Sequence, residues 1–223
     1  MSYKIDESKQ LGFYFDQTRC GACNACTVAC KDWNQVNPGK AAWRKQFTYE
    51  LADGFFPLAF GCNHCDEPAC ATVCSAGAIT KDANGIVTVN RDKCQKLEMC
   101  VTACPFAKPQ IADDKQEPNP HVSWRVSHPM QKCNFCTDRL ATGMEPACVA
   151  SCVGRALDFG TVEYIKNQYP DAKRLNYSDF PYAFVNNQND TGPNLFIKPI
   201  AKQNTAGGML IHKSGLYTGK RQD

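Results

Sequence analysis

Cysteine spacing restricts the folds open to this chain more than any other feature of its sequence. The cysteines fall into four groups, of which three have four members and one has three. In chain order the groups are Cys20, Cys23, Cys26 and Cys30; Cys62, Cys65, Cys70 and Cys74; Cys94, Cys100 and Cys104; and Cys133, Cys136, Cys148 and Cys152. Every group ends in C-x3-C, and every complete group begins with C-x2-C. The pattern indicates one motif repeated four times, with insertions in the second and fourth copies.

The abundance of cysteine has two explanations, disulfides in a secreted scaffold or thiolates that bind metal. The count is odd, at 15 in 223 residues, the cysteines are tightly clustered, and no signal peptide is recognisable. These features favour metal. A zinc ribbon pairs C-x2-C knuckles and accepts histidine, which matches neither the C-x2-C-x2-C of group one nor the repeated C-x3-C. His64, inside group two, is expected to face solvent or support a ligand rather than bind metal.

Iron–sulfur clusters explain the spacing of the cysteines. Two-residue gaps let consecutive thiolates point inward from a short loop toward the iron corners of one cubane, while the loop amides can bond its sulfides. The fourth cysteine, three residues on, is expected to begin the following helix and to face away, so that it binds a neighbouring cluster. Four motifs then predict four clusters that share cysteines in swapped pairs.

Group three is one ligand short. Leu97 lies between Cys94 and Cys100, where C-x2-C-x2-C-x3-C would place a cysteine. Leucine has no atom that binds metal, and we expect it to line the open corner with apolar surface that disfavours water. A cubane corner without a thiolate loses its iron readily, which predicts a 3Fe-4S cluster. A 4Fe-4S cluster with a non-cysteine ligand and an empty site stay open as alternatives.

Composition and charge exclude several other classes of protein. With 43% hydrophobic and 21% charged residues the chain is typical of a globular protein, and no apolar run reaches the roughly 18–20 residues of a membrane helix. The formal charge of +3 becomes roughly −5 if four clusters contribute about −2 each, so no nucleic-acid partner is expected. The polar N-terminus predicts either a cytoplasmic protein or one carried to the periplasmic or extracytoplasmic face by co-export with a partner.

Short strands are predicted around the cysteine groups. An aromatic segment from Leu11 to Cys20 predicts a strand that leads into group one. Two β-branched runs, Ala78–Thr80 and Ile86–Val89, flank Asn84-Gly85 and predict a hairpin. After group four, "GRALDFG" predicts another short strand. Small elements around clusters indicate an α+β fold in which the clusters and their thiolates replace much of the core.

Three further segments carry no cysteine motif. Lys31–Phe60 is an insertion between groups one and two. Lys132, just before group four, is expected to shape the cluster loop or an interface. Residues 171–223 are rich in Asn, Gly and Pro, with only short apolar pieces. Because this tail has too little apolar surface to fold alone, we expect it to be extended along another protein.

Motif order and local sequences resemble the four-cluster iron–sulfur (beta) subunits of the molybdopterin oxidoreductases, most of all those of dimethyl sulfoxide reductases. The likeness runs from about Leu11 to Ile200 and rests on "CNHCDEPAC", "ACPFAKPQ", "KCNFCTDRL" and "ALDFG". It implies tandem bacterial-type ferredoxin-like units, each binding two 4Fe-4S clusters, with insertions and an extended C-terminal tail. The implied first unit comprises residues 1–54 and 116–170, the second is inserted at 55–115, and the tail at 171–223 packs on a partner.

The resemblance also implies which cysteines share a cluster, since that family pairs group one with group four and group two with group three. Carried over residue by residue, three 4Fe-4S clusters take Cys20, Cys23, Cys26 and Cys152; Cys133, Cys136, Cys148 and Cys30; and Cys62, Cys65, Cys70 and Cys104. Cys94, Cys100 and Cys74 are left for the fourth cluster. Leu97 departs from the dimethyl sulfoxide reductase pattern, whereas relatives of the nitrate reductase type also lack this cysteine and carry three irons there.

The function that the resemblance implies is electron transfer in anaerobic respiration. The partners would be a large molybdenum or tungsten bis-guanine-dinucleotide catalytic subunit and a membrane anchor, haem, quinone or other redox partner. No bond-making chemistry is expected in this chain, because its histidines are scattered and it has no Ser/His/Asp grouping or phosphate loop. The alternative is an iron–sulfur enzyme that does its chemistry at the open three-cysteine cluster.

Overall fold

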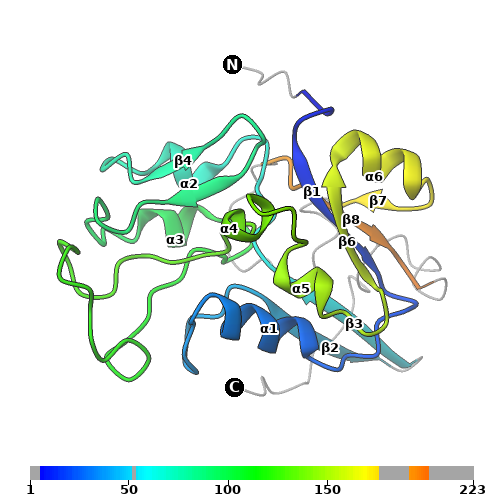
Figure 1. Cartoon of the computed structure of the whole chain (residues 1–223), viewed down its shortest axis with the longest axis horizontal. Helices are drawn as coiled ribbons and strands as arrows, with labels where there is room; N and C mark the ends of the chain where they lie inside the picture. Colours follow the sequence, from blue (N-terminus) through cyan, green and yellow to red (C-terminus); the bar gives the residue numbers. More distant parts are fainter. Residues whose placement is uncertain (1–5, 52–53, 176–190, 201–223) are drawn as a thin grey trace.

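A four-stranded sheet organises one side of the molecule in the computed structural model, which describes residues 6–51, 54–175 and 191–200 (Figure 1). Its strands, in spatial order, are β6 (Leu157–Thr161), β1 (Leu11–Asp16), β8 (Leu195–Lys198) and β7 (Lys173–Arg174). β1 pairs antiparallel with β6 and parallel with β8. The strands predicted before group one and after group four are both confirmed.

Alternation along β1 gives the sheet two buried faces. Phe13 and Phe15 point into the main hydrophobic core, while Tyr14 packs on the other face with Phe196. Helix α6 (Val162–Gln168) covers that other face with its buried residues. Because successive side chains of a strand point to opposite sides, one aromatic run serves both layers.

Part of the predicted tail belongs to this sheet. β7 and β8 lie within residues 171–223, and Leu195, Phe196 and Ile197 are all buried. The expectation that 171–223 extends along a partner is therefore wrong for this part. Strand β8 pairs with β1, and its apolar side chains are buried by the sheet that it joins. The low apolar content of the tail as a whole does not reveal this. Residues 176–190 and 201–223 lie outside the described residues.

Two hairpins flank the cysteine loops. Strands β2 (Lys45–Leu51) and β3 (Gly54–Phe60) pair antiparallel within the insertion between groups one and two. Strands β4 (Ile79–Lys81) and β5 (Val87–Val89) form the hairpin predicted from the sequence. Its turn uses Gly85 at φ +76°, a left-handed conformation that glycine adopts without strain. The β4–β5 hairpin delivers the chain to group three.

A short helix starts at the closing C-x3-C of each group. These helices are α1 (Ala25–Trp33), α2 (Ala69–Thr72), α3 (Met99–Ala103) and α5 (Ala147–Ala150), with α4 (Thr137–Leu140) following the C-x2-C of group four. Helices α1, α2, α3 and α5 each begin one residue before the first cysteine of the closing C-x3-C, so the expectation that the helix begins at the last cysteine is wrong. In α1 both cysteines of the C-x3-C lie on one helix face, about 6 Å apart along its axis, whereas α2, α3 and α5 end before the second cysteine. α1 packs against α5, and α2 against α3.

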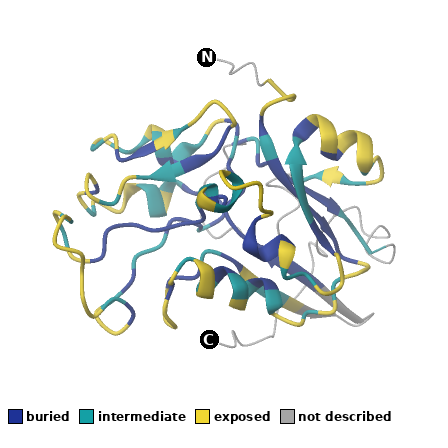
Figure 2. Cartoon of the chain, in the orientation of Figure 1, coloured by how far each residue is buried: buried dark blue, intermediate teal, exposed yellow. Residues whose placement is uncertain are grey.

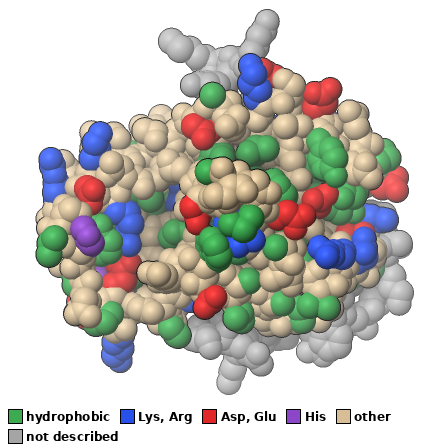
Figure 3. All heavy atoms as spheres, in the orientation of Figure 1, with side chains coloured by type: hydrophobic (Ala, Val, Ile, Leu, Met, Phe, Trp, Pro, Cys, Tyr) green, Lys and Arg blue, Asp and Glu red, His purple; other side chains and the backbone are tan. Residues whose placement is uncertain are grey.

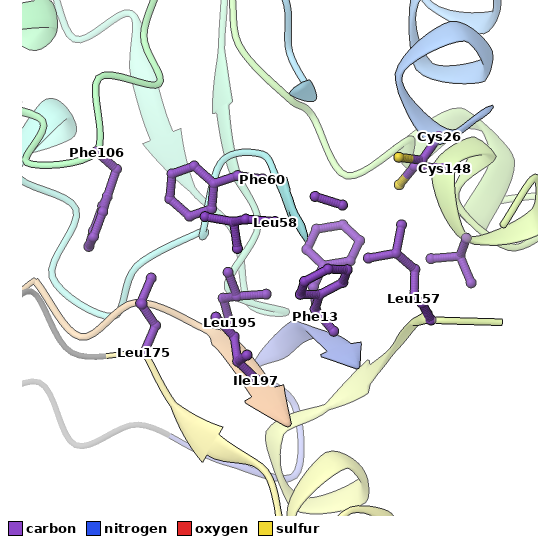
Figure 4. Close-up of a cluster of buried hydrophobic side chains, with 14 of the residues drawn as sticks. Phe13, Cys26, Leu58, Phe60, Phe106, Cys148, Leu157, Leu175, Leu195 and Ile197 are labelled. Atoms are coloured by element: carbon purple, nitrogen blue, oxygen red, sulfur yellow. The ribbon is translucent and has the colours of Figure 1, made fainter. Parts of the chain in front are cut away.

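Cysteines form part of the hydrophobic core. In the close-up of Figure 4, the sulfurs of Cys26 and Cys148 lie side by side near Leu157, at one end of a cluster that includes Phe13 and Phe60. Figure 2 shows buried residues along β1 and on α5, whereas the outer side of α6 is exposed. On the face drawn in Figure 3, acidic and basic side chains are interspersed. Among the described residues, no helix has both the length and the apolar character to cross a bilayer.

Candidate functional site

The C-x2-C loops share one backbone geometry in all four cysteine groups. The residue two places after the first cysteine has a positive φ in each, 56° at Ala22, 44° at His64, 54° at Lys96 and 62° at Phe135. This left-handed region is uncommon for residues other than glycine and carries strain. It aims the residue's own amide back at the preceding sulfur, as where Phe135 N donates to Cys133 Sγ at 3.4 Å. The loops are therefore four copies of one sulfur-binding turn.

Group three keeps this turn although it lacks a cysteine. Glu98 has φ 58°, matching Asn24 of group one at 64°, and each residue caps the helix that follows. Leu97 thus occupies the place that Cys23 occupies in group one. Leu97 is 58% exposed, and Cys23 is exposed as well. Leu97 also lines a cavity beside the group-three cysteines.

Three cavities are each lined by cysteines drawn from two groups. They enclose about 340, 360 and 420 Å³ of empty space, part of it open to solvent. The first is lined by Cys20, Cys23, Cys26 and Cys152; the next by Cys62, Cys65, Cys70 and Cys104; and the last by Cys74, Cys94 and Cys100 together with Leu97. We call them the first, third and fourth sites.

The four remaining cysteines, Cys30, Cys133, Cys136 and Cys148, also lie together and form the second site. The Asn34 amide nitrogen lies 3.8 Å from Cys30 Sγ and 3.9 Å from Cys136 Sγ, so it spans two of these sulfurs. Burial, and after it the neighbouring Cys148, raises the pKa of Cys30 to about 12. All fifteen cysteines of the chain are free thiols, and each belongs to one of the four sites.

Burial makes these sulfurs poor thiolates on their own. Burial, together with neighbouring thiols, raises the pKa of Cys70 to about 12 and that of Cys100 to about 11. It also raises the pKa of Cys65 and Cys133 well above the usual range. A buried thiolate is costly without a positive partner. The sulfurs become good ligands only where metal supplies that positive charge.

Three buried cations surround the sites. Arg44, Lys108 and Lys132 are 2%, 7% and 2% exposed, and in the described part of the chain no carboxylate lies within 4.0 Å of their charged groups. Lys132 Nζ lies 3.6 Å from Cys62 Sγ. Burial lowers the pKa of Lys108 to about 7 against the opposing effect of Cys104 and Cys62. Because buried charges need counter-charges, the cysteine sites are where these cations find them.

An unsatisfied donor fits the same interpretation. The side-chain amide nitrogen of Asn63 is buried, has no hydrogen-bond partner among the described residues, and belongs to a residue that lines the third site. The sulfides of an iron–sulfur cluster accept hydrogen bonds, so the four thiols, the lysines and this amide suit such a group. His64 is fully buried, so the solvent-facing alternative is wrong; its Nδ1 accepts a hydrogen bond from Val87 N at 3.0 Å.

Sequence reasoning missed several residues of the sites. Thr191 Oγ1 donates to Cys65 Sγ at 3.2 Å across a separation of 126 residues. Arg44 lies in the insertion, and Asn34 follows group one without belonging to a motif. None of these has a spacing signal, because each reaches its site only through the tertiary fold. Lys132 does have a signal, its position next to Cys133, although its reach to Cys62 could not be foreseen.

Comparison with known proteins supplies the family. A family described as the 4Fe-4S dicluster domain matches residues 54–162. One subunit of the anaerobic dimethyl sulfoxide reductase of Shigella flexneri is 34% identical over 210 residues, which cover 89% of this protein and 93% of the relative. Thiosulfate reductase electron transfer subunit PhsB of Salmonella typhi is 39% identical over 162 residues, covering 70% and 78%. The formate dehydrogenase iron-sulfur subunit of Haemophilus influenzae is 31% identical over 199 residues, covering 78% and 60%.

Proposed function

Because this protein belongs to the iron–sulfur electron-transfer subunits of the molybdopterin oxidoreductases, we propose that it relays single electrons through four clusters bound at the four sites. Three sites are assigned 4Fe-4S clusters: the first site with Cys20, Cys23, Cys26 and Cys152; the second with Cys30, Cys133, Cys136 and Cys148; and the third with Cys62, Cys65, Cys70 and Cys104. The observation that carries this proposal is that cysteines from two groups converge at each site, around a cavity at the first and third sites and beside the Asn34 amide at the second.

The chain's own residues hold and order the route. Iron–sulfur clusters, when bound, supply reversible one-electron transfer at potentials set by charge, hydrogen bonds and exposure. Cys26 and Cys30 on α1 link the first site to the second, and Cys70 and Cys74, on α2 and just beyond its end, link the third to the fourth. The proposed order along the molecule is first, second, third and fourth site.

At the fourth site we propose a 3Fe-4S cluster held by Cys74, Cys94 and Cys100. Leu97 stands at the position of the missing ligand within an unchanged turn, and it offers carbon instead of sulfur. A three-iron cluster needs no ligand at that corner. The competing assignment, a 4Fe-4S cluster with a non-cysteine ligand, predicts one more iron and no three-iron signal in the oxidised protein.

The proposed partners lie at the two ends of the relay. A catalytic subunit with a molybdenum or tungsten bis-guanine-dinucleotide cofactor would exchange electrons at one end. At the other, Leu97 and Met99 expose apolar surface beside the fourth site, 58% and 57% exposed, which suits exchange with a membrane, quinone or haem partner. This assembly would work at the extracytoplasmic face after co-export, or in the cytoplasm.

Iron and acid-labile sulfide analysis of the anaerobically purified protein tests the proposal. The expected iron content is about 15 atoms per chain, from three four-iron clusters and one three-iron cluster. Electron paramagnetic resonance should show a three-iron signal in the oxidised state and four one-electron centres on titration. Far fewer irons would contradict the relay. Substrate turnover by the isolated chain would instead support chemistry at the open corner.

A further inference from the structure

Lys132 occupies an unusual position for a lysine. Its side chain is among the largest that are fully buried in the molecule, with 2% exposed. Its ammonium donates to Val87 O on β5 and, at 3.0 Å, to Cys133 O in the group-four loop. It lies 3.6 Å from Cys62 Sγ in the group-two loop. These contacts place one positive charge where the paired cysteine groups one and four meet the paired groups two and three.

That meeting point is the junction of the second and third sites. Cys133 belongs to the second site, and Cys62 to the third, whose cavity Lys132 also lines. Elsewhere the neighbouring sites are joined by the closing C-x3-C segments, whose two cysteines lie on a short helix or just beyond its end. Between the second and third sites the connection is made by facing loops, and Lys132 bonds to both. No carboxylate of the described residues neutralises it.

The structure assigns Lys132 an electrostatic role: its fixed positive charge raises the reduction potentials of the second and third sites together and so favours electron passage between the two pairs of clusters. The inference rests on the proposed four-cluster function and deepens it. A reduced cluster carries one more negative charge than an oxidised one, and a fixed cation nearby stabilises the reduced form. The low effective dielectric of a buried junction lets one charge act on both neighbours.

Lys108 offers a matched comparison within the same cavity. It is also a buried lysine that lines the third site, and its Nζ lies 4.1 Å from the centroid of the Phe60 ring. Unlike Lys132, it has no contact with the group-four loop among its described interactions. Loss of Lys108 should therefore alter the reduction potential of the third site alone. Loss of Lys132 should alter the potentials of the second and third sites.

The test is a redox titration of the loaded protein, followed by electron paramagnetic resonance, in Lys132→Met, Lys132→Gln, Lys132→Arg and Lys108→Met. Methionine removes the charge at similar length, and glutamine keeps an N–H donor for the two carbonyls. At a fixed ambient potential, both neutral Lys132 variants should lower the reduced-to-oxidised ratio of two centres about tenfold, or about 59 mV for one electron. Lys132→Arg should keep both centres near the wild-type ratio.

Each outcome of the titration either supports or overturns the inference on Lys132. Two shifted centres in the neutral Lys132 variants, one of them shared with Lys108→Met, support the inference. Unshifted centres, or a shift confined to one centre, overturn it while the relay stands. If the neutral variants lose iron and Lys132→Arg retains it, Lys132 serves assembly alone and the inference is wrong. Wild-type protein without four one-electron centres would instead overturn the proposed function.

Discussion

The second and fourth sites use the same cysteine turn in opposite surroundings. In the second, Phe135 lies between the two cysteines of the loop, is fully buried, and stacks on Phe13 of β1 with ring centroids 4.2 Å apart. In the fourth, the equivalent loop carries Lys96 and leads to Leu97, which is 58% exposed. The contrast is visible in Figure 2, where the α3 region shows less buried surface than the region around β1.

The comparison shows that the backbone geometry of the cysteine turn and the burial around it are independent of each other. Backbone geometry at the loops is set by the need to aim amides at sulfur, and it is the same in both places. Burial is set by which element lies over the loop. The sheet covers the second site, whereas the fourth rests on a small core made of two cysteines, Ala78, Ile79, Val87 and Met130. Electron transfer benefits when an inner site such as the second is shielded from solvent and a terminal site such as the fourth is accessible to a partner.

Removing the iron should expose this contrast most strongly. When a chelator strips the clusters anaerobically, we expect β4, β5 and α3 to lose amide protection first, because little apolar core remains there. Strands β1, β6 and β8 have aromatic layers on both faces and should hold longer. Hydrogen exchange in β4 and β5 should accelerate at least about tenfold more than in β1. Equal acceleration in both regions would contradict the contrast.

A core truncation at the second site should come next in size. Phe135→Ala removes a buried ring that packs on Phe13, His64 and Phe159, and should cost about 3–5 kcal/mol of unfolding free energy. Anaerobic urea titration of the loaded protein measures it.

The matched substitution for Phe135→Ala is at the fourth site. Met99→Ala truncates a side chain that is 57% exposed, and it should stay within about 0.5 kcal/mol of the wild type. Similar losses from both variants would mean that the two sites are equally supported, contrary to the packing described above.

Sequence spacing predicted the local parts of this structure well. The strands around groups one and four and the β4–β5 hairpin follow from short runs of aromatic and β-branched residues beside turn signals. These features depend on residues close in sequence, or on a repeat that can be recognised from the spacing of the cysteines. The sharing of particular cysteines between clusters, which the family resemblance implies, stays a prediction.

Long-range features could not be predicted. Parallel pairing of β8 with β1 joins residues about 180 positions apart, and a four-residue strand has no distinctive pattern. The buried state of Arg44 depends on the β2–β3 hairpin, where its guanidinium donates to Ala59 O at 3.2 Å. Helix starts were misplaced because one-turn helices follow from packing around the thiols rather than from propensity.

Restoring the missing cysteine should make the fourth site resemble the others. Leu97→Cys places a thiol in a turn whose φ values already match those of group one, so it should add one iron per chain and abolish the three-iron signal of the oxidised protein. The added iron and thiolate should also lower the potential of that centre.

Met99→Cys is the control for Leu97→Cys, because Met99 is equally exposed but lies on α3 beyond the turn. It should leave the signal and the iron content unchanged. Persistence of the three-iron signal in the Leu97→Cys protein would show that the group-three ligands are misassigned.

The prediction with the smallest expected effect tests whether single hydrogen bonds, in addition to burial, set the reduction potential of the third site. Thr191 is 3% exposed and donates from Oγ1 to Cys65 Sγ at 3.2 Å. A donor to a ligating sulfur stabilises the reduced cluster, so Thr191→Val, which keeps the shape, should lower the reduced-to-oxidised ratio of one centre about threefold. Thr72→Val is the matched control, since Thr72 is exposed and its hydroxyl faces Pro68 O rather than sulfur. A shift in both variants, or in neither, would mean that this hydroxyl does not tune the third site and that burial alone sets its potential.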